Sequence, residues 1–183
     1  MDVESIHSKE ERMMSFMHSL ISECIQRKEN GKRERKRSNI MISQEEKDLQ
    51  RKWAIQLFNE TWDLIEKKDR TRDDDSQMLE KAYASLYHWR QVGTKLNLVR
   101  GFWQVSRVHS ILGQGDSAYF YGISGVELCE AEGYGDFDVA FAYESVARAE
   151  KSRGNRESMN SWFDRGQAAA ENIAKEQDKN YFL

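Results

Sequence analysis

The sequence predicts an all-α protein built from antiparallel helix hairpins, and three observations lead to that class. Proline is absent from all 183 residues, whereas an average chain of this length has about nine, so the commonest helix breaker is missing. Apolar residues recur every three or four positions, which is the spacing of one helix face. Glycines fall mostly at the ends of these segments, and the short polar connections between them make neighbouring helices antiparallel.

The first part of the chain differs from the rest. Residues 1–30 are predicted to hold an extra amphipathic helix over about 5–28, which ends at Asn30-Gly31. Residues 31–43 follow as a linker, and its basic run at 32–37 has no apolar residue to bury. That run is interpreted as solvated; contact with nucleic acid or an anionic surface is the alternative. The apolar stripe of the helix is Ile6, Met13, Met14, Met17, Leu20, Ile21, Cys24 and Ile25.

Six further helices are predicted within a single helical repeat domain over residues 44–178, and residues 179–183 form a C-terminal tail. Ser43 and Glu46 have the spacing of a capping box at the start of the first helix. Its apolar residues are Leu49, Trp53, Leu57, Trp62, Leu64 and Ile65. The six predicted helices span about 44–69, 76–92, 94–112, 116–131, 136–153 and 155–177.

An internal repeat with a period of 41 residues relates these helices. Such a period is typical of arrays in which each hairpin buries its apolar stripe against the next. Counting backwards, Trp103 corresponds to Trp62 and Asp116 to Asp75. Counting forwards, Phe102 corresponds to Tyr143, Val105 to Val146, Ser106 to Ala147, Arg107 to Arg148, Gly113 to Gly154 and Ser117 to Ser158.

The hairpin over residues 136–177 resembles the tetratricopeptide repeat. Tyr143 stands at the bulky position of its first helix, Val146 and Ala147 at the Leu-small pair, and Gly154-Asn155 at the turn. Phe163 stands at the aromatic position of the second helix. The chain departs from the pattern at Met159 and Gly166, where alanine is usual, in the absence of proline, and in a period longer than 34.

The resemblance covers about residues 50–175 and implies a short right-handed array of stacked hairpins. The segments 83–94 and 135–149 are also similar to a group of short, uncharacterised bacterial proteins of this hairpin type. That second resemblance implies no activity.

Composition argues against several classes of function. The formal net charge is −3 and the isoelectric point is near 5.9, so the chain lacks the basic footprint of a nucleic-acid-binding protein. No segment approaches the roughly 20 apolar residues that span a bilayer, and acidic residues stand where a signal peptide needs basic ones. We therefore expect a cytoplasmic protein without membrane contact, with Cys24 and Cys129 as buried free thiols.

No catalytic or metal-binding pattern is evident. The four histidines form no His-x-x-x-His pair and no cluster with cysteine. The segment Gly113-Gln114-Gly115-Asp116 lacks the lysine and the preceding strand of a phosphate-binding loop, and a repeat turn explains it. We accordingly predict no enzyme activity, no metal site and no cofactor.

A partner-binding groove is implied by the resemblance, because the first helix of each hairpin lines the concave side of tetratricopeptide-like arrays. Arg100 and Arg107 lie about two turns apart on one helix face, with Trp103 between or beside them. Guanidinium groups pair with carboxylates and stack on indole rings, so an acidic peptide suits this groove. The alternative is that the arginines bridge acidic residues of neighbouring helices. The predicted groove residues are Asn59, Trp62, Arg100, Trp103, Gln104, Arg107, Glu144 and Arg148.

A second candidate is the cluster Tyr87, His88 and Trp89, either as a pocket wall or as an aromatic seam between helices. Taken together, the sequence predicts a non-enzymatic protein–protein interaction module that binds a peptide or helix in its groove. One alternative is a regulatory array that senses a small peptide or metabolite. Another is a helical homodimer formed through the N-terminal helix.

Overall fold

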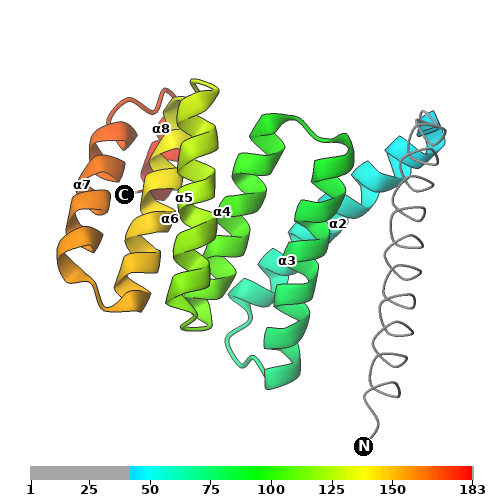
Figure 1. The fold of residues 1–183 in the computed structure, drawn as a ribbon, viewed down its shortest axis with the longest axis horizontal. Helices are drawn as coiled ribbons and strands as arrows, with labels where there is room; N and C mark the ends of the chain where they lie inside the picture. The colour runs from blue at the N-terminus through cyan, green and yellow to red at the C-terminus, as the bar shows by residue number, and fades with distance from the viewer. Residues whose placement is uncertain (1–41, 183) are drawn as a thin grey trace, which may run out of the picture. The chain divides into compact units, whose positions relative to one another are not determined.

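The computed structural model describes residues 42–182, which are all-helical apart from their turns, as predicted. Gln44–Leu183 forms one compact unit. The predicted helix at 5–28 and the basic run at 32–37 lie outside the described residues. The seven helices of the described part are α2 (Gln44–Glu66), α3 (Arg72–Val92), α4 (Lys95–Ile111), α5 (Gly115–Ala131), α6 (Asp136–Arg153), α7 (Arg156–Ala170) and α8 (Glu176–Phe182), drawn in Figure 1.

Threonine side chains determine where α3 and α4 begin. The Thr71 hydroxyl accepts the amide of Asp74 at 3.2 Å, and the Asp74 carboxylate accepts the amide of Thr71 at 2.8 Å. Thr94 and Asn97 make the same reciprocal pair at the start of α4. Each pair satisfies amides that the first helical turn leaves unbonded. As a result α3 begins at Arg72, earlier than the predicted start at 76.

The last predicted helix, 155–177, is two helices in the structure. Between α7 and α8, Ile173 is buried against Ala140 of α6. The amide of Ala174 donates to Asp136 Oδ1 at 3.0 Å. The Ala174 amide thus bonds to α6 instead of the Ala170 carbonyl, to which it would donate in a continuous helix; that carbonyl accepts from Ile173.

The core lies between helices that are neighbours in the chain. α2 packs on α3, α4 on α5 and α6 on α7, while α3–α4, α5–α6 and α4–α6 contacts join these pairs. Leu49 and Trp53, predicted on the apolar side of α2, remain 50% and 41% exposed. One buried cluster joins α3 to α4 through Met78, Ala82, Leu86, Phe102, Val105 and Val108. A second joins α4, α5 and α6 through Val99, Val126, Cys129, Ala142 and Val146.

Buried hydroxyl groups form hydrogen bonds between these helices. Ser85 Oγ donates to the Ala54 carbonyl at 2.8 Å, linking α3 to α2. Ser106 Oγ donates to the Ala118 carbonyl at 2.8 Å, linking α4 to α5. Because both bonds are buried, each removes the cost of an unpaired polar group from the core.

Cys129 is a buried free thiol, as predicted. Burial raises the pKa of its thiol to about 11, so it carries little thiolate at neutral pH. Cys24 lies outside the described residues. Within the described helices, none is long and apolar enough to cross a membrane.

Candidate functional site

A connected row of aromatic rings crosses α2, α4 and α6, and we call it the aromatic row. Phe58 and Trp62 of α2 have ring centroids 6.4 Å apart, and Trp62 lies 5.3 Å from Trp103 of α4. Trp103 lies 5.4 Å from Phe141 of α6, which stacks on Phe137 at 4.2 Å. Rings at these separations attract one another and bury large apolar areas. The row therefore fixes the spacing of the three helices and places aromatic faces beside one another.

A cavity of about 480 Å³, which we call the first cavity, adjoins this row. Phe58, Trp103 and Phe137 supply its aromatic wall. The buried indole nitrogen of Trp103 has no hydrogen-bond partner among the described residues. The charged residues of its lining come from α4, from the start of α6 and from the chain around α8, and they are Arg100, Asp136, Asp138, Lys175 and Asp178.

Arg100 is held by a carboxylate of the neighbouring helix α6. Its Nε donates to Asp138 Oδ1 at 2.7 Å and its Nη2 donates to Asp138 Oδ2 at 3.1 Å. This two-pronged bond raises the pKa of Arg100, burial opposes the rise, and the negative charge of Asp178 adds to it. Arg100 therefore bridges an acidic residue of a neighbouring helix, as the alternative interpretation of the arginines expects.

Arg107 extends in the other direction along the face. Its guanidinium carbon lies 5.6 Å from the centroid of the Trp62 ring of α2, a cation–π contact. The two arginines of α4 thus reach opposite neighbours, with Arg100 on α6 and Arg107 on α2. Trp103 lies between them in the chain and contacts aromatic rings of both neighbours.

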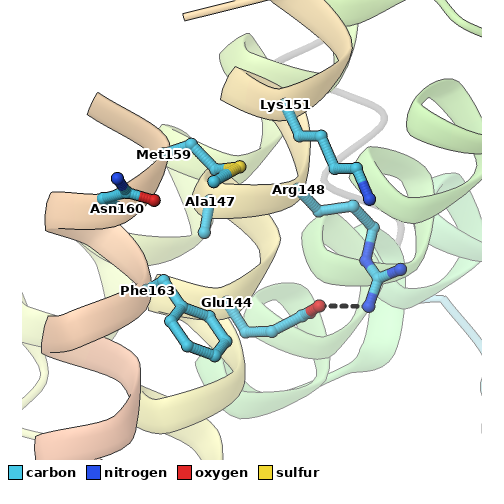
Figure 2. Close-up of a pocket in the computed structure, with 7 residues that line it drawn as sticks. All are labelled: Glu144, Ala147, Arg148, Lys151, Met159, Asn160 and Phe163. Atoms are coloured by element: carbon cyan, nitrogen blue, oxygen red, sulfur yellow. Dashed lines mark hydrogen bonds and ion pairs between the residues drawn. The ribbon is translucent and has the colours of Figure 1, made fainter. Parts of the chain in front are cut away.

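Glu144 and Arg148 form an ion pair on α6, and both line a second cavity of about 360 Å³ between α6 and α7. Figure 2 shows Met159 and Phe163 of α7 on the side of Ala147, while the charged side chains of α6 extend away from α7. We call this space the second cavity. Its lining residues are Glu144, Ala147, Arg148, Lys151, Met159, Asn160 and Phe163.

Gln104 requires a correction. Its side chain is 1% exposed, and its amide donates to the Phe58 carbonyl of α2 at 2.9 Å. It is therefore an internal link between α2 and α4 and does not face the groove. Asn59, by contrast, is exposed on α2.

Tyr87, His88 and Trp89 do not line either of the two cavities described above. His88 bonds through Nδ1 to Gln50 of α2, and its ring lies 5.7 Å from that of Tyr87. Tyr87 is 60% exposed. The Trp89 ring packs against Gly93, and a Cβ added at Gly93 would lie only 2.9 Å from that ring. His88 therefore links α3 to α2, which fits the seam interpretation better than the pocket wall.

A buried histidine joins α3, α4 and α5 outside both cavities. His109 Nε2 accepts from the Tyr83 hydroxyl at 2.6 Å, and Nδ1–H donates to Gln114 Oε1 at 2.6 Å. Its ring stacks on Tyr121 at 5.9 Å. Burial lowers the pKa of His109, opposed by the bond to Gln114, and burial raises the pKa of Tyr83 to about 12. Both pKa shifts follow because burial favours the neutral forms of the hydrogen-bonded Tyr83 and His109 side chains.

The sequence pattern did not single out several residues of the aromatic row and of the first cavity. Phe137 and Phe141 are four residues apart and share one face of α6, but the repeat places Glu144 at the position of Trp103 and so directs attention away from them. Lys175 and Asp178 come to the first cavity only because the chain turns after α7. No local periodicity encodes that turn.

No family model, no curated protein and no solved structure matches this chain. Among the described residues, no group of three or more histidine, cysteine, aspartate or glutamate side chains is arranged to hold a metal ion.

Proposed function

We propose that this chain is a non-enzymatic protein–protein interaction module whose helices form three tetratricopeptide-like antiparallel hairpins. The hairpins are α2–α3, α4–α5 and α6–α7, stacked as a short right-handed array. The pairwise packing and the additional α4–α6 contact support this arrangement. So do the helix starts, because α6 begins 41 residues after α4, and α7 begins 41 residues after α5.

The aromatic row with its first cavity is the observation that carries the proposal. A cavity of about 480 Å³ lies within the range of roughly 300–1,000 Å³ that is usual for ligand sites. Aromatic rings beside a few charged groups are the composition typical of binding hot spots. A large apolar side chain of a peptide or helix would bury its surface against Phe58, Trp103 and Phe137, while the peptide backbone or polar side chains meet the charged rim.

The charge of the partner follows from the arginines. Arg100 already pairs with Asp138, and the first cavity has three carboxylates against Arg100 and Lys175, so an acidic group is not favoured there. Arg107 and Arg148 stand at corresponding positions of α4 and α6, nearer the carboxyl ends of both helices. We therefore place an apolar anchor in the first cavity and an acidic residue of the same partner toward Arg107 and Arg148, where it would share Arg148 with Glu144.

A selection from a phage-displayed library of random peptides tests the proposal without a known partner. We expect the selected peptides to share a large apolar residue and a separate Asp or Glu. The double variant Arg107→Glu/Arg148→Glu should bind them at least about tenfold more weakly, because two attractive charges become repulsive. A matched control is Phe120→Glu, since Phe120 is 63% exposed on α5 and lines neither cavity.

Circular dichroism and the melting temperature of each variant show whether a loss of binding comes from unfolding. The proposal is wrong if no shared pattern emerges, or if the selected peptides bind the double variant and the wild type equally.

A further inference from the structure

Helix α6 packs in the groove between α4 and α5, and this contact shows how the chain binds a helix. We call the surface of α4 and α5 that contacts α6 the α6 seat. α6 enters that groove so closely that a Cβ added at Gly122 would lie 3.2 Å from Val146 Cγ2 and 3.3 Å from Ser145 Oγ. Ser152 Oγ of α6 donates to the Ser110 carbonyl at 3.4 Å, near the end of α4. The seated helix thus presents one branched apolar residue between small side chains, followed by polar contacts about two turns later.

An ion pair closes the far end of the same seat. Arg153 Nε of α6 donates to Asp116 Oδ1 of α5 at 3.0 Å, and the guanidinium lies 4.5 Å from the Tyr119 ring centroid. The seat therefore recognises a helix by shape at its centre and by charge at its end.

The second cavity stands at the corresponding place of the next pair, α6 and α7. Each of five residues in its lining lies 41 positions after a residue at or beside the α6 seat. Ala147 corresponds to Ser106, Lys151 to Ser110, Met159 to Ala118, Asn160 to Tyr119 and Phe163 to Gly122.

Within residues 42–182, one end of this corresponding groove is covered by the chain itself. Ile173 packs on Ala140 and Ala170, which correspond to Val99 and Cys129 of the α6 seat. Toward the other end, the second cavity of about 360 Å³ is open, and Phe163 is 45% exposed (Figure 2). An exposed phenylalanine beside an alanine and a methionine is a surface that gains stability when apolar groups cover it.

We propose that the second cavity is a docking site for one amphipathic helix of a partner protein, seated on α6 and α7 as α6 is seated on α4 and α5. The partner helix presents a branched apolar residue to Ala147, Met159 and Phe163. This site lies apart from the first cavity but shares Arg148 with the contact proposed for the acidic residue, so Phe163, which the peptide selection does not use, tests it separately. The internal correspondence that defines the occupant rests on the proposed repeat.

Charge differences between the two grooves specify the partner further. Lys151 corresponds to Ser110, whose carbonyl accepts the hydrogen bond from Ser152 of α6. Ser152 lies six positions after Val146, so the partner helix carries an acidic residue six positions after its apolar residue. Glu157 stands at the position of Asp116, so a basic residue follows directly, as Arg153 does in α6. An apolar residue with an acid–base pair six and seven positions later is the expected recognition pattern.

The probe for this site is a synthetic peptide with the sequence of residues 136–153, labelled for fluorescence anisotropy. A hydrocarbon bridge between positions 143 and 147, one helical turn apart, holds the peptide helical. These positions are chosen because Tyr143 and Ala147 face α7 in the folded chain, so the bridge leaves the binding face of the peptide unchanged. A second peptide carries Ser152→Glu. We expect both to bind the full chain, the second about two- to fivefold more tightly, as is typical of an added exposed ion pair.

Variants of the full chain locate the binding. Phe163→Glu should weaken binding of both peptides at least about tenfold, because it places a charge in the apolar seat. Phe120→Glu, which changes another exposed phenylalanine, on α5, should leave binding unchanged. Lys151→Glu should reverse the preference, so that the peptide with Ser152 binds more tightly than the peptide with Glu.

Methyl NMR of Met159 gives an independent location, with shifts expected at Met159 on addition of either peptide. The proposal is overturned if the bridged peptides do not bind, if Phe163→Glu binds them like the wild type, or if the shifts appear on the aromatic row instead. Sedimentation adds one further outcome. A wild-type dimer that Phe163→Glu makes monomeric would assign the groove to a second copy of this chain, against a partner helix.

Discussion

At the scale of single residues, the interior of this helical unit is held in register by buried polar groups as well as by apolar packing. Gln104 and His109 are buried side chains of α4, and both form hydrogen bonds with neighbouring segments. Such groups stabilise only the arrangement that satisfies them, because any shift leaves a buried donor or acceptor unpaired. They therefore specify how the helices align.

The His109 network predicts a pH dependence of stability. Burial lowers the pKa of His109 below its ordinary value of 6.5. Between the lowered and the ordinary pKa, the unfolded chain binds more protons than the folded chain, so the free energy of unfolding falls as the pH drops through 6.5. The stabilising contribution of neutral His109 to the free energy of unfolding is fully present above pH 6.5.

Urea unfolding of the wild type and of His109→Gln, measured from pH 8 to pH 5, tests this dependence. The variant should be less stable at pH 8, because its side chain fits the network less well, and its stability should fall less steeply between pH 7 and pH 5. Parallel pH curves for the two proteins would show that His109 does not titrate differently on folding.

Gly115 predicts a second residue-scale effect, since α5 and α6 approach each other closely there. A Cβ there would lie 2.9 Å from the Arg153 backbone nitrogen and 3.0 Å from the Ser152 carbonyl carbon. Backbone atoms of a helix cannot move aside individually, so Gly115→Ala should lower the free energy of unfolding by about 1–3 kcal/mol. The matched control is Gly135→Ala, where the added Cβ meets nothing within 4 Å. Equal stability of the two variants in urea unfolding would contradict the close approach.

At the scale of helices, the sequence predicts most boundaries well where local signals decide them. The predicted helix at 136–153 has the bounds of α6, and Gly154 ends it in the left-handed region at φ 75°. The sequence predicts the start of α3 too late, because the capping pair Thr71–Asp74 lies in a polar stretch without apolar periodicity. The predicted helix at 155–177 was wrong beyond Ala170, because contacts with α6 decide that boundary.

The candidate site was predictable only in part, for a related reason. Arg100, Trp103 and Arg107 lie at spacings of three and four on α4; Trp62 of α2 contacts Trp103 and Arg107, and Arg100 and Trp103 line the first cavity. The carboxylate that holds Arg100 lies 38 residues away in the chain. Pairing between helices depends on how the helices rotate against one another, which periodicity within one helix does not define.

The capping boxes support a prediction at this scale. Thr71→Ala removes the hydroxyl that accepts the Asp74 amide, and it should lower the free energy of unfolding by about 1 kcal/mol. Thr71→Ser keeps the hydroxyl and is the matched control. Thermal unfolding followed by circular dichroism measures both. Serine that destabilises as much as alanine would assign the effect to the lost methyl group.

Asp74 adds a pH signature to the same helix end. Hydrogen bonds from Lys67 and from the Thr71 amide lower the pKa of Asp74 to about 2. Its stabilising effect is present above its ordinary pKa of 3.8 and is lost as the pH falls toward 2. The wild type should therefore lose stability in that acidic range more steeply than Asp74→Asn does.

At the scale of the whole helical unit, α6 connects the two candidate binding surfaces. Its first turn carries Asp136 and Asp138 of the first cavity, and its later turns carry Arg148 and Lys151 of the second. Acidic residues at the start of a helix and basic residues toward its end complement the helix dipole. The charges that give the two cavities opposite character thus also stabilise the helix that joins them.

Burial along the unit is uneven, and this predicts where the unit opens first. α4 and α6 each contain eight buried residues, whereas α2 and α7 contain two each. In stacked hairpins each pair gains stability from its neighbours, so the ends open at lower free energy than the centre. Native-state hydrogen exchange should therefore show the strongest protection in α4 and α6 and the weakest in α2 and α7. Gly115→Ala should reduce protection in α5 and α6 more than in α2, because it disturbs the interface between α5 and α6. Equal protection of all helices would mean that the unit unfolds as one cooperative block, and the surface of α7 would then be as rigid as the centre.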